Sequence, residues 1–247
     1  MAILCRDLRL LFVQAPRTAC TAIEILLVQR FGGESLPPEN ILDRDGFIRV
    51  QSKHCTIPQL RAEGLLPADY ASRYTTLTTV RNPFDSLVSL YVKKRDKYEK
   101  DVADPTSWVH SVRGYVEDIE FCRTHTFSEW AMKRYAVGRL DRLLGKGRRS
   151  LYGRYTAGVE TVMRFERLQQ DFEAVMRRLG IEDGVTIPAV NRTAQRSSRY
   201  QEYYTPETRK LVEYVFRDEL TRYGYSFDGF NEGVAVSGAL VADGSAR

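Results

Sequence analysis

The feature that most constrains the fold is an apolar segment that stops at a proline and resumes, after a short polar turn, with helical spacing. Residues 11–15 read Leu-Phe-Val-Gln-Ala, and Pro16 ends this run. Apolar side chains then recur at helical spacing at Ile23, Leu26, Leu27 and Phe31. The pattern predicts a buried strand, a turn and a helix. The N-terminus of such a helix offers unpaired N–H groups and a positive dipole end, which favour binding of a phosphate or a sulfate.

Three polar residues of this turn add hydrogen-bond donors to the predicted anion site: Arg17, Thr18 and Thr21. The turn lacks the glycines and the Gly-Lys-Ser/Thr ending of a Walker A loop, which disfavours an ordinary ATP or GTP site. Taken alone, the segment fits a plain strand-to-helix turn with a solvated Arg17 equally well. A second segment of the same kind favours the anion site.

The second strand-to-helix turn lies at residues 75–92. Residues 75–80 are rich in β-branched side chains and predict a strand, which runs directly into Arg81-Asn82-Pro83. Apolar residues then recur at helical spacing at Phe84, Leu87, Val88, Tyr91 and Val92. Ser89 lies away from that apolar stripe, so we expect its hydroxyl to face the same opening as Arg81. Two such turns predict two anion sites on adjacent strands.

These two segments resemble the nucleotide-binding motifs of the sulfotransferases that use 3′-phosphoadenosine 5′-phosphosulfate (PAPS). Residues 16–21, Pro-Arg-Thr-Ala-Cys-Thr, are similar to the family's 5′-phosphosulfate loop, whose usual form is Pro-Lys-Thr-Ala-Gly-Thr. Residues 81–89 are similar to its 3′-phosphate motif, an Arg-Asn-Pro with a Ser eight residues after the Arg. Weaker similarity covers residues 162–168 and 191–204. The resemblance implies an α/β fold with a central, mainly parallel sheet flanked by helices, the P-loop-like nucleotide-binding fold of sulfotransferases.

The resemblance also implies which residues bind the donor. Arg17, Thr18 and Thr21 are expected on the phosphosulfate, and Arg81 and Ser89 on the 3′-phosphate. The polar tract at 191–204 is expected to cover the nucleotide, although its arginines also fit a surface loop. The full set of expected donor-binding residues is Arg17, Thr18, Ala19, Cys20, Thr21, Ala22, Arg81, Ser89, Arg196 and Arg199. PAPS is the expected sulfuryl donor and PAP the expected product.

His54 is the candidate general base. Residues 47–51 alternate as a short strand that ends near it, and functional sites gather at strand ends of α/β sheets. The ordinary pKa of histidine, near 6.5, suits proton abstraction at neutral pH. Its position resembles that of the histidine base in several sulfotransferase branches. The alternative is that His54 only makes hydrogen bonds within a turn and has no catalytic role. Arg17 is the second expected catalytic residue, because it can stabilise the bridging oxygen of the leaving phosphate.

Three residues depart from the family's usual loop. Arg17 replaces a Lys, and a permanently charged guanidinium is a poor proton donor. Cys20 replaces a Gly, so a positive φ at this position would bring strain. Ala22 replaces a common Ser and removes one hydroxyl contact. We therefore expect that donor binding can be weaker here than is usual in the family.

Charge and composition limit the partners. The 37 Lys and Arg against 32 Asp and Glu give a formal charge of +5, a mild excess that suits anionic ligands and falls short of a dedicated nucleic-acid binder. No hydrophobic run is long enough to span a bilayer and residues 1–9 lack the features of a signal peptide, so we expect a soluble, cytoplasmic protein. The cysteines have no metal-ligand spacing, and we expect no metal.

The chain of 247 residues is long enough for one full core. We expect a single domain over residues 1–230 and a flexible tail over 231–247, where the composition falls to small residues. Residues 145–149, Gly-Lys-Gly-Arg-Arg, predict a mobile loop. Apolar stripes predict further helices over 168–179 and from Pro206 onward. Six aromatic residues of the middle region are candidates for an acceptor wall by resemblance, although such residues more often belong to the core: Trp108, Tyr115, Phe121, Phe127, Trp130 and Tyr135.

The expected activity is transfer of a sulfuryl group from PAPS to a hydroxyl or an amine of an acceptor, either a small molecule or a glycan. Two alternatives stay open at this point. One is a nucleotide-dependent phosphotransferase on a related sheet. The other is a PAP-binding module that has lost turnover, which the departures at Arg17, Cys20 and Ala22 favour. The sequence leaves the acceptor and the oligomeric state open.

Overall fold

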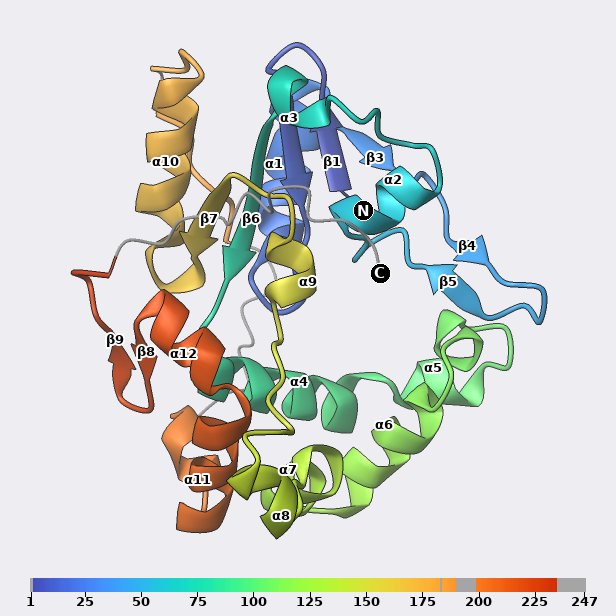
Figure 1. Ribbon diagram of the computed structural model, residues 1–247. Coiled ribbons are helices and arrows are strands. Elements are labelled where there is room, and N and C mark those ends of the chain that lie inside the picture. The colour runs from blue at the N-terminus through green and yellow to red at the C-terminus, as the bar shows by residue number, and fades with distance from the viewer. Residues whose placement is uncertain (1, 183, 190–198, 235–247) are drawn as a thin grey trace.

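A five-stranded sheet forms the centre of the protein, whose computed structural model describes residues 2–182, 184–189 and 199–234 (Figure 1). The strand order is β3-β1-β2-β6-β7. Strands β2, β6 and β7 are parallel neighbours, and β1 runs antiparallel to both β2 and β3. The bounds are Ala2–Cys5 (β1), Leu10–Val13 (β2), Glu34–Leu36 (β3), Thr75–Val80 (β6) and Thr161–Arg164 (β7). The expected α/β fold with a mainly parallel sheet is confirmed.

Helices and two small hairpins surround this sheet. The α-helices are α1 Cys20–Phe31, α2 Ile57–Ala62, α3 Tyr70–Arg73, α4 Pro83–Lys97, α5 Glu99–Ala103, α6 Tyr115–Thr124, α7 Phe127–Tyr135, α8 Arg139–Leu143, α9 Gly153–Thr156, α10 Leu168–Arg178, α11 Pro206–Val215 and α12 Arg217–Tyr223. The 3₁₀ helices are η1 Trp108–Ser111, η2 Phe165–Arg167 and η3 Tyr200–Tyr203. The hairpins pair β4 Ile41–Leu42 with β5 Ile48–Val50, and β8 Tyr225–Ser226 with β9 Gly229–Phe230.

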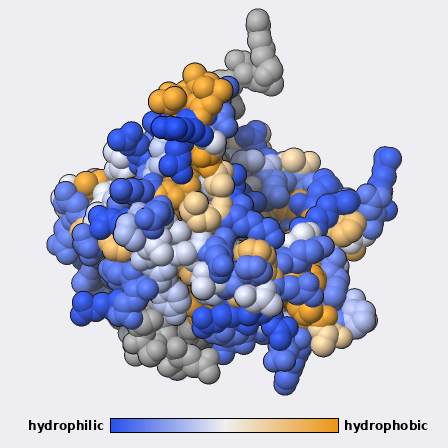
Figure 2. All heavy atoms as spheres, turned by 90° about the horizontal axis from the view of Figure 1, so that it is seen from below, coloured by the Kyte–Doolittle hydropathy of each residue, from blue (hydrophilic) through white to orange (hydrophobic). Residues whose placement is uncertain are grey.

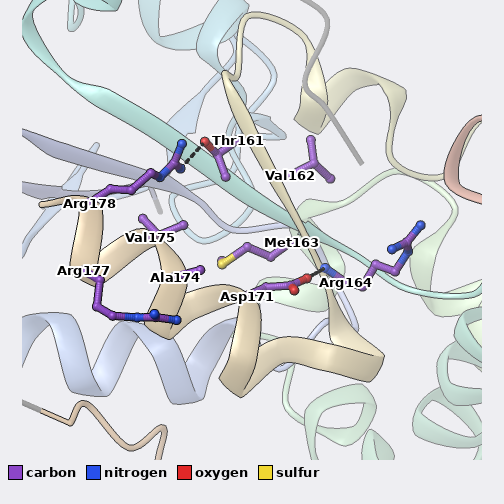
Figure 3. A pocket seen from close by; sticks show the side chains of 9 residues that line it. All are labelled: Thr161, Val162, Met163, Arg164, Asp171, Ala174, Val175, Arg177 and Arg178. Atoms are coloured by element: carbon purple, nitrogen blue, oxygen red, sulfur yellow. Dashed lines mark hydrogen bonds between the residues drawn. The ribbon is translucent and has the colours of Figure 1, made fainter. Parts of the chain in front are cut away.

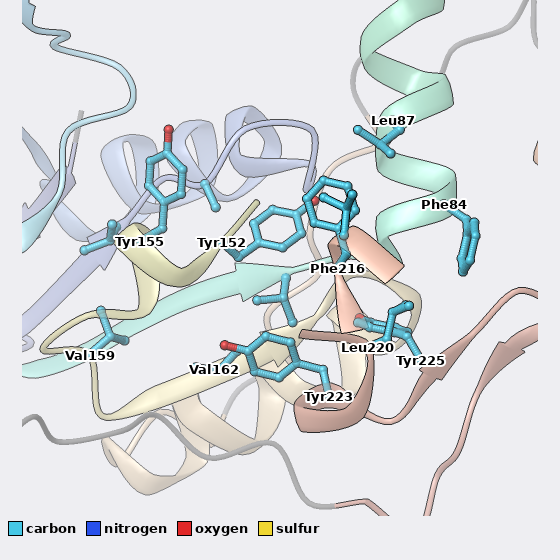
Figure 4. Close-up of a cluster of buried hydrophobic side chains, with 14 of the residues drawn as sticks. Phe84, Leu87, Tyr152, Tyr155, Val159, Val162, Phe216, Leu220, Tyr223 and Tyr225 are labelled. Atoms are coloured by element: carbon cyan, nitrogen blue, oxygen red, sulfur yellow. The ribbon is translucent and has the colours of Figure 1, made fainter. Parts of the chain in front are cut away.

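The sheet is buried on both faces, because alternate residues of its strands enter two different cores. Leu10 and Phe12 join Ile23 of α1 and Phe172 of α10 on one face. Leu11 and its neighbours enter the larger core on the other face, which receives side chains from α4, α7, α9, α11 and α12. Figure 4 shows part of this second core, with Phe84, Leu87, Tyr152, Tyr155, Val159, Val162, Phe216, Leu220, Tyr223 and Tyr225 labelled. Burial on both faces explains why β2 reads as a continuous apolar run.

The helices predicted at the two strand-to-helix turns begin where the sequence pattern places them. α1 follows the turn after β2, and α4 begins at Pro83 directly after β6. The helix predicted from Pro206 is α11, and Thr205 caps it by accepting a hydrogen bond from the amide of Thr208. α10 ends at Arg178, and Gly180 follows with a φ of 81°.

Most aromatic residues of the middle region belong to the core. Phe127, Trp130 and Tyr135 are buried together with residues of α4 and α11. Trp108 and Tyr115 instead form a small separate cluster with Tyr98. Phe121, the sixth candidate, is partly buried against the larger core.

The described part of the expected tail contacts the body of the protein. The amide of Asn231 donates to the carbonyl of Gly224 at 2.7 Å, and the Arg164 guanidinium donates to the carbonyl of Val234. Residues 235–247 lie outside the described residues. Within the described part of the chain, no helix is long and apolar enough to cross a membrane.

Asn82 joins the start of α4 to the hairpin near the end of the described chain. Its side-chain oxygen accepts from the amide of Phe84 at 3.1 Å, and its Nδ2 donates to the carbonyls of Ser226 at 2.8 Å and Gly229 at 3.2 Å. The side chain is 3 % exposed. This asparagine therefore holds the second turn in place.

We expect Asn82→Ala to lower the free energy of unfolding by about 1 to 3 kcal/mol, because it removes three hydrogen bonds, one of which caps α4. Urea denaturation followed by circular dichroism measures this. Gln29→Ala, at an exposed position of α1, is the control and should change stability by less than about 0.5 kcal/mol. Equal stability of Asn82→Ala and the wild type would contradict this role.

Candidate active site

The turn between β2 and α1 holds two residues in the left-handed backbone region. Arg17 has a φ of 66° and Ala19 a φ of 57°. Each costs about 1 kcal/mol for a residue with a Cβ atom. The expectation that strain falls on Cys20 is therefore corrected, because Cys20 is already the first residue of α1 and the reversal occurs before it. Thr18 braces the turn, since its hydroxyl donates to the carbonyl of Ala15 at 2.8 Å.

The N-terminus of α1 carries no side-chain cap. Ala19 occupies the N-cap position and has no oxygen to offer to the amides of the first turn. Thr21 is half-buried on that first turn, and Ala22 is buried. Uncapped amides together with the helix dipole favour an anion at this point.

Arg81 lies at the end of the neighbouring strand β6 and reaches across to the first turn. Its Nη1 donates to the carbonyl of Arg17 at 2.9 Å, and its Nε donates to the Asp85 carboxylate at 2.7 Å. The guanidinium also stacks 4.2 Å from the ring centroid of Phe165. The side chain of Arg81 is only 11 % exposed. The two predicted anion sites are therefore directly connected.

Ser89 contacts the arginine of the other turn. The Nε and Nη2 atoms of Arg17 donate to its hydroxyl oxygen at 2.9 and 2.6 Å. The sequence analysis predicted that Ser89 and Arg81 act together. In the structure, Arg81 instead forms an ion pair with Asp85, which lies one helical turn before Ser89. The interlocked side chains thus form one basic cluster rather than two separate ones.

This cluster holds two guanidinium groups and one carboxylate, Asp85, in a poorly solvated place. Burial lowers the pKa of Arg17, and the nearby charge of Arg81 lowers it further. Lys53 and Lys93 lie close enough to lower the pKa of His54 as well. Like charges held this close are stabilised by an anion between them, so the cluster suits a ligand that carries several negative charges.

His54 lies beside the first turn and is oriented by its backbone. Its Nδ1 is 2.9 Å from the carbonyl oxygen of Gln14. A carbonyl only accepts, so Nδ1 carries the hydrogen and Nε2 keeps its lone pair. Burial lowers the pKa of His54 to about 3, with smaller contributions from Lys53 and Lys93. The imidazole is therefore neutral at physiological pH.

Gln14 is a site residue that sequence reasoning missed. It is fully buried, and neither its Oε1 nor its Nε2 has a hydrogen-bond partner among the residues that the structure describes. Thr79 Oγ1 is also buried and unpaired, and it follows Thr78, which pairs with Val13 in the register of the sheet. The signal for Gln14 was a polar side chain at the end of an otherwise apolar strand. Such atoms are costly to bury without a partner, which fits a polar ligand or water at this edge.

Three further expected positions complete the picture. Burial raises the pKa of the Cys20 thiol, which therefore stays protonated at neutral pH. Arg199 is exposed at the N-cap of η3. Arg196 lies outside the described residues.

Two further residues of the site were not predicted from the sequence. Asp85 orients Arg81, and Lys53 forms an ion pair with Glu24 at 3.2 Å.

A separate hollow of about 560 Å³ lies along the edge strand β7 and α10 (Figure 3). It is braced by a hydrogen bond from Arg178 to Thr161 at 3.0 Å and by one from the Arg164 amide to Asp171 at 2.8 Å. None of the residues that line it belongs to the predicted site. Among the described residues, no group of three or more His, Cys, Asp or Glu side chains is placed to hold a metal ion.

The fold and the site together define a class of protein. Two neighbouring parallel strands each end in a basic turn that leads into a helix, which is the arrangement of an α/β protein that binds an anionic nucleotide. A sequence profile of the Sulfotransferase family matches residues 1–226. The chain belongs to the sulfotransferase family, an enzyme family, and the family implies PAPS as the sulfuryl donor. The resemblance noted in the sequence is thus confirmed. Searches of curated proteins and of solved structures returned no match.

The lowered pKa of His54 predicts a pH dependence of stability. Its pKa is about 3 in the folded protein and about 6.5 in the unfolded chain. Between these values only the unfolded chain binds the extra proton, so stability falls as pH drops below 6.5. We expect this term to remove about 1 to 2 kcal/mol from wild-type stability between pH 7 and pH 5.

His54→Asn should lack that term, because its amide can keep the bond to the Gln14 carbonyl without titrating. The measurement is urea unfolding of both proteins at a series of pH values. His125→Asn, which changes an exposed histidine, serves as the control. A constant stability difference between His54→Asn and wild type from pH 7 to pH 5 would show that the folded protein does not lower the pKa of His54.

Proposed function

We propose that the protein transfers a sulfuryl group from PAPS to a hydroxyl or an amine of a small-molecule or glycan acceptor, with His54 as the general base. The observation that carries this proposal is the connection between the two turns. Arg81 donates to the carbonyl of Arg17, and Arg17 donates to Ser89. Residues from both turns can therefore contact one ligand at the same time.

The residues present fit a donor that is charged at both ends. We place the phosphosulfate at the uncapped N-terminus of α1. The residues assigned to it are Arg17, Thr18, Ala19, Cys20, Thr21 and Ala22. Arg81 and Ser89 are assigned to the 3′-phosphate, with Arg199 and Arg196 as further candidates. Each charged hydrogen bond contributes about 1.5 to 3 kcal/mol, so a few of them separate this donor from AMP or ATP.

The acceptor must lose a proton as it attacks the sulfur. In the transfer, a bond forms between the acceptor oxygen or nitrogen and sulfur, and the bond between sulfur and the bridging phosphate oxygen breaks. Nε2 of His54 takes the acceptor proton, while Nδ1–H stays on the Gln14 carbonyl and fixes the ring. The negative charge of the donor offsets the surrounding cations and so raises the proton affinity of His54 in the complex.

We assign to Arg17 the stabilisation of the negative charge that develops on the leaving phosphate oxygen. A guanidinium keeps its proton, so Arg17 acts by electrostatic stabilisation and hydrogen bonding. The product then leaves as the anion PAP without protonation by this residue. In the structure, the Ser89 hydroxyl accepts hydrogen bonds from Arg17 and holds its side chain close to α4.

Two broader expectations belong to the proposal. We place the catalytic unit in one domain over residues 1–230, with a tail over 231–247. The cytoplasmic location stays a prediction, as does the expectation that the protein binds no nucleic acid and no metal.

Loss of Arg81 should remove the preference for PAP over AMP. We expect Arg81→Ala to lower the ratio of PAP affinity to AMP affinity by about 10- to 100-fold, because only PAP carries the 3′-phosphate. Isothermal titration calorimetry with both nucleotides measures the ratio. Ser89→Ala should lower it by about 2- to 10-fold, which keeps the test valid if Arg81→Ala fails to fold.

Arg95→Ala is the matched control, because Arg95 lies on the same helix and is exposed. It should leave the ratio unchanged. Equal affinity of the wild type for PAP, AMP and ATP would contradict the assignment and favour a nucleotide-dependent phosphotransferase.

Loss of His54 should stop turnover and spare donor binding. With labelled PAPS and a panel of hydroxyl and amine acceptors, we expect His54→Asn to lower transfer by about 100-fold or more and to bind PAP within about twofold of wild type. His125→Asn should transfer as the wild type does. Wild-type protein that binds PAP but transfers to no acceptor would instead identify a PAP-binding module without turnover.

A further inference from the structure

A short helix far along the chain from the site exposes three leucines. Leu140 is 70 % exposed, Leu143 82 % and Leu144 59 %, and they lie on α8 or at its C-cap. Single exposed leucines are common on protein surfaces. Three of them close together form an exposed apolar patch, which is typical of an interaction site. Figure 2 shows the molecule from below, the side on which α8 lies in Figure 1, with apolar residues gathered in a protrusion among hydrophilic ones.

The segment that carries these leucines is fixed to the body of the protein. The Lys146 amide donates to the carbonyl of Asp141 at 2.7 Å, and the Tyr214 hydroxyl of α11 donates to the carbonyl of Lys146 at 2.7 Å. The Arg149 amide donates to the carbonyl of Val215, also at 2.7 Å. The residues predicted as a mobile loop are thus bonded to α11, and the leucines point outward from a braced support.

Basic side chains surround the leucines. Exposed cationic residues of this segment are Arg139, Arg142, Lys146, Arg148 and Arg149. Asp141 is the acidic residue within the segment, and Arg148 forms an ion pair with Asp218 at 2.9 Å. The positive charges exceed the negative ones, so the surface around the apolar patch is cationic.

We propose that α8 and the following residues 144–149 dock the protein on the surface of an anionic phospholipid bilayer. The leucines enter the interfacial region of the bilayer, and the basic residues contact the lipid phosphates and carboxylates. A protruding apolar patch needs a hollow of matching shape on a protein partner, whereas a fluid bilayer adapts to it. The basic border supplies the charge complementarity that an anionic membrane requires.

This surface is separate from the candidate site, so it can be altered without changing donor binding. None of the residues of the docking segment contacts Arg17, His54 or Arg81 through a hydrogen bond or an ion pair that the described residues show. The proposal therefore stands or fails independently of the sulfuryl transfer.

The test is co-sedimentation of the full chain with unilamellar vesicles. At about 0.1 M NaCl, we expect binding to phosphatidylcholine vesicles with about 30 % phosphatidylserine to be about tenfold tighter than to phosphatidylcholine alone. Leu140→Ser combined with Leu143→Ser should weaken binding to the anionic vesicles by about tenfold. Arg139→Gln combined with Lys146→Gln should reduce the preference for phosphatidylserine severalfold, and added salt should reduce it further.

Leu42→Ser is the matched control, because Leu42 is a leucine of β4 that is 51 % exposed outside the docking segment. It should bind vesicles as the wild type does, and all variants should keep the wild-type affinity for PAP. No binding to anionic vesicles, or equal binding of the double leucine variant and the wild type, would overturn the proposal. A third outcome would overturn the proposal in favour of self-association. In it, the wild type forms a dimer and does not bind vesicles, and the double leucine variant is a monomer.

Discussion

The hydrogen bond from Arg81 to the main-chain carbonyl of Arg17 is the contact on which the site depends. It joins the turns that follow two neighbouring parallel strands, and it places one guanidinium against the backbone from which the other extends. The first turn has left-handed backbone at Arg17 and Ala19. Two cations and an uncapped helix N-terminus then lie together, an arrangement that an anionic nucleotide stabilises. His54 belongs to the same structure, because the carbonyl of Gln14, three residues before Arg17, orients it.

Much of this arrangement could be predicted from the sequence. The apolar run of β2 and the β-branched run of β6 are long enough to specify strands that are buried on both faces. The periodic stripes after Pro16 and Pro83 specify the helices, and parallel strands place both turns at one edge of the sheet. Local pattern therefore predicted which two turns lie side by side, because each motif is a strand, a turn and a helix in direct succession.

The remaining features depend on tertiary contacts that no local pattern encodes. β1 is a strand because both β2 and β3 pair with it. Ser89 bonds Arg17 and Asp85 bonds Arg81, and a helical stripe cannot show which arginine each of these side chains contacts. The positive φ values fall before Cys20 because the helix starts at that residue. The lowered pKa of His54 comes mainly from burial, which only the folded chain produces.

The most direct measurement of the central claim is a crystal structure of the protein with bound PAP. We expect the 3′-phosphate within hydrogen-bond distance of the Arg81 guanidinium and the Ser89 hydroxyl. We expect the 5′-phosphate at the N-terminus of α1, in contact with Arg17 and the first-turn amides. PAP bound elsewhere, or bound with only one of its two ends at the joined turns, would contradict the account.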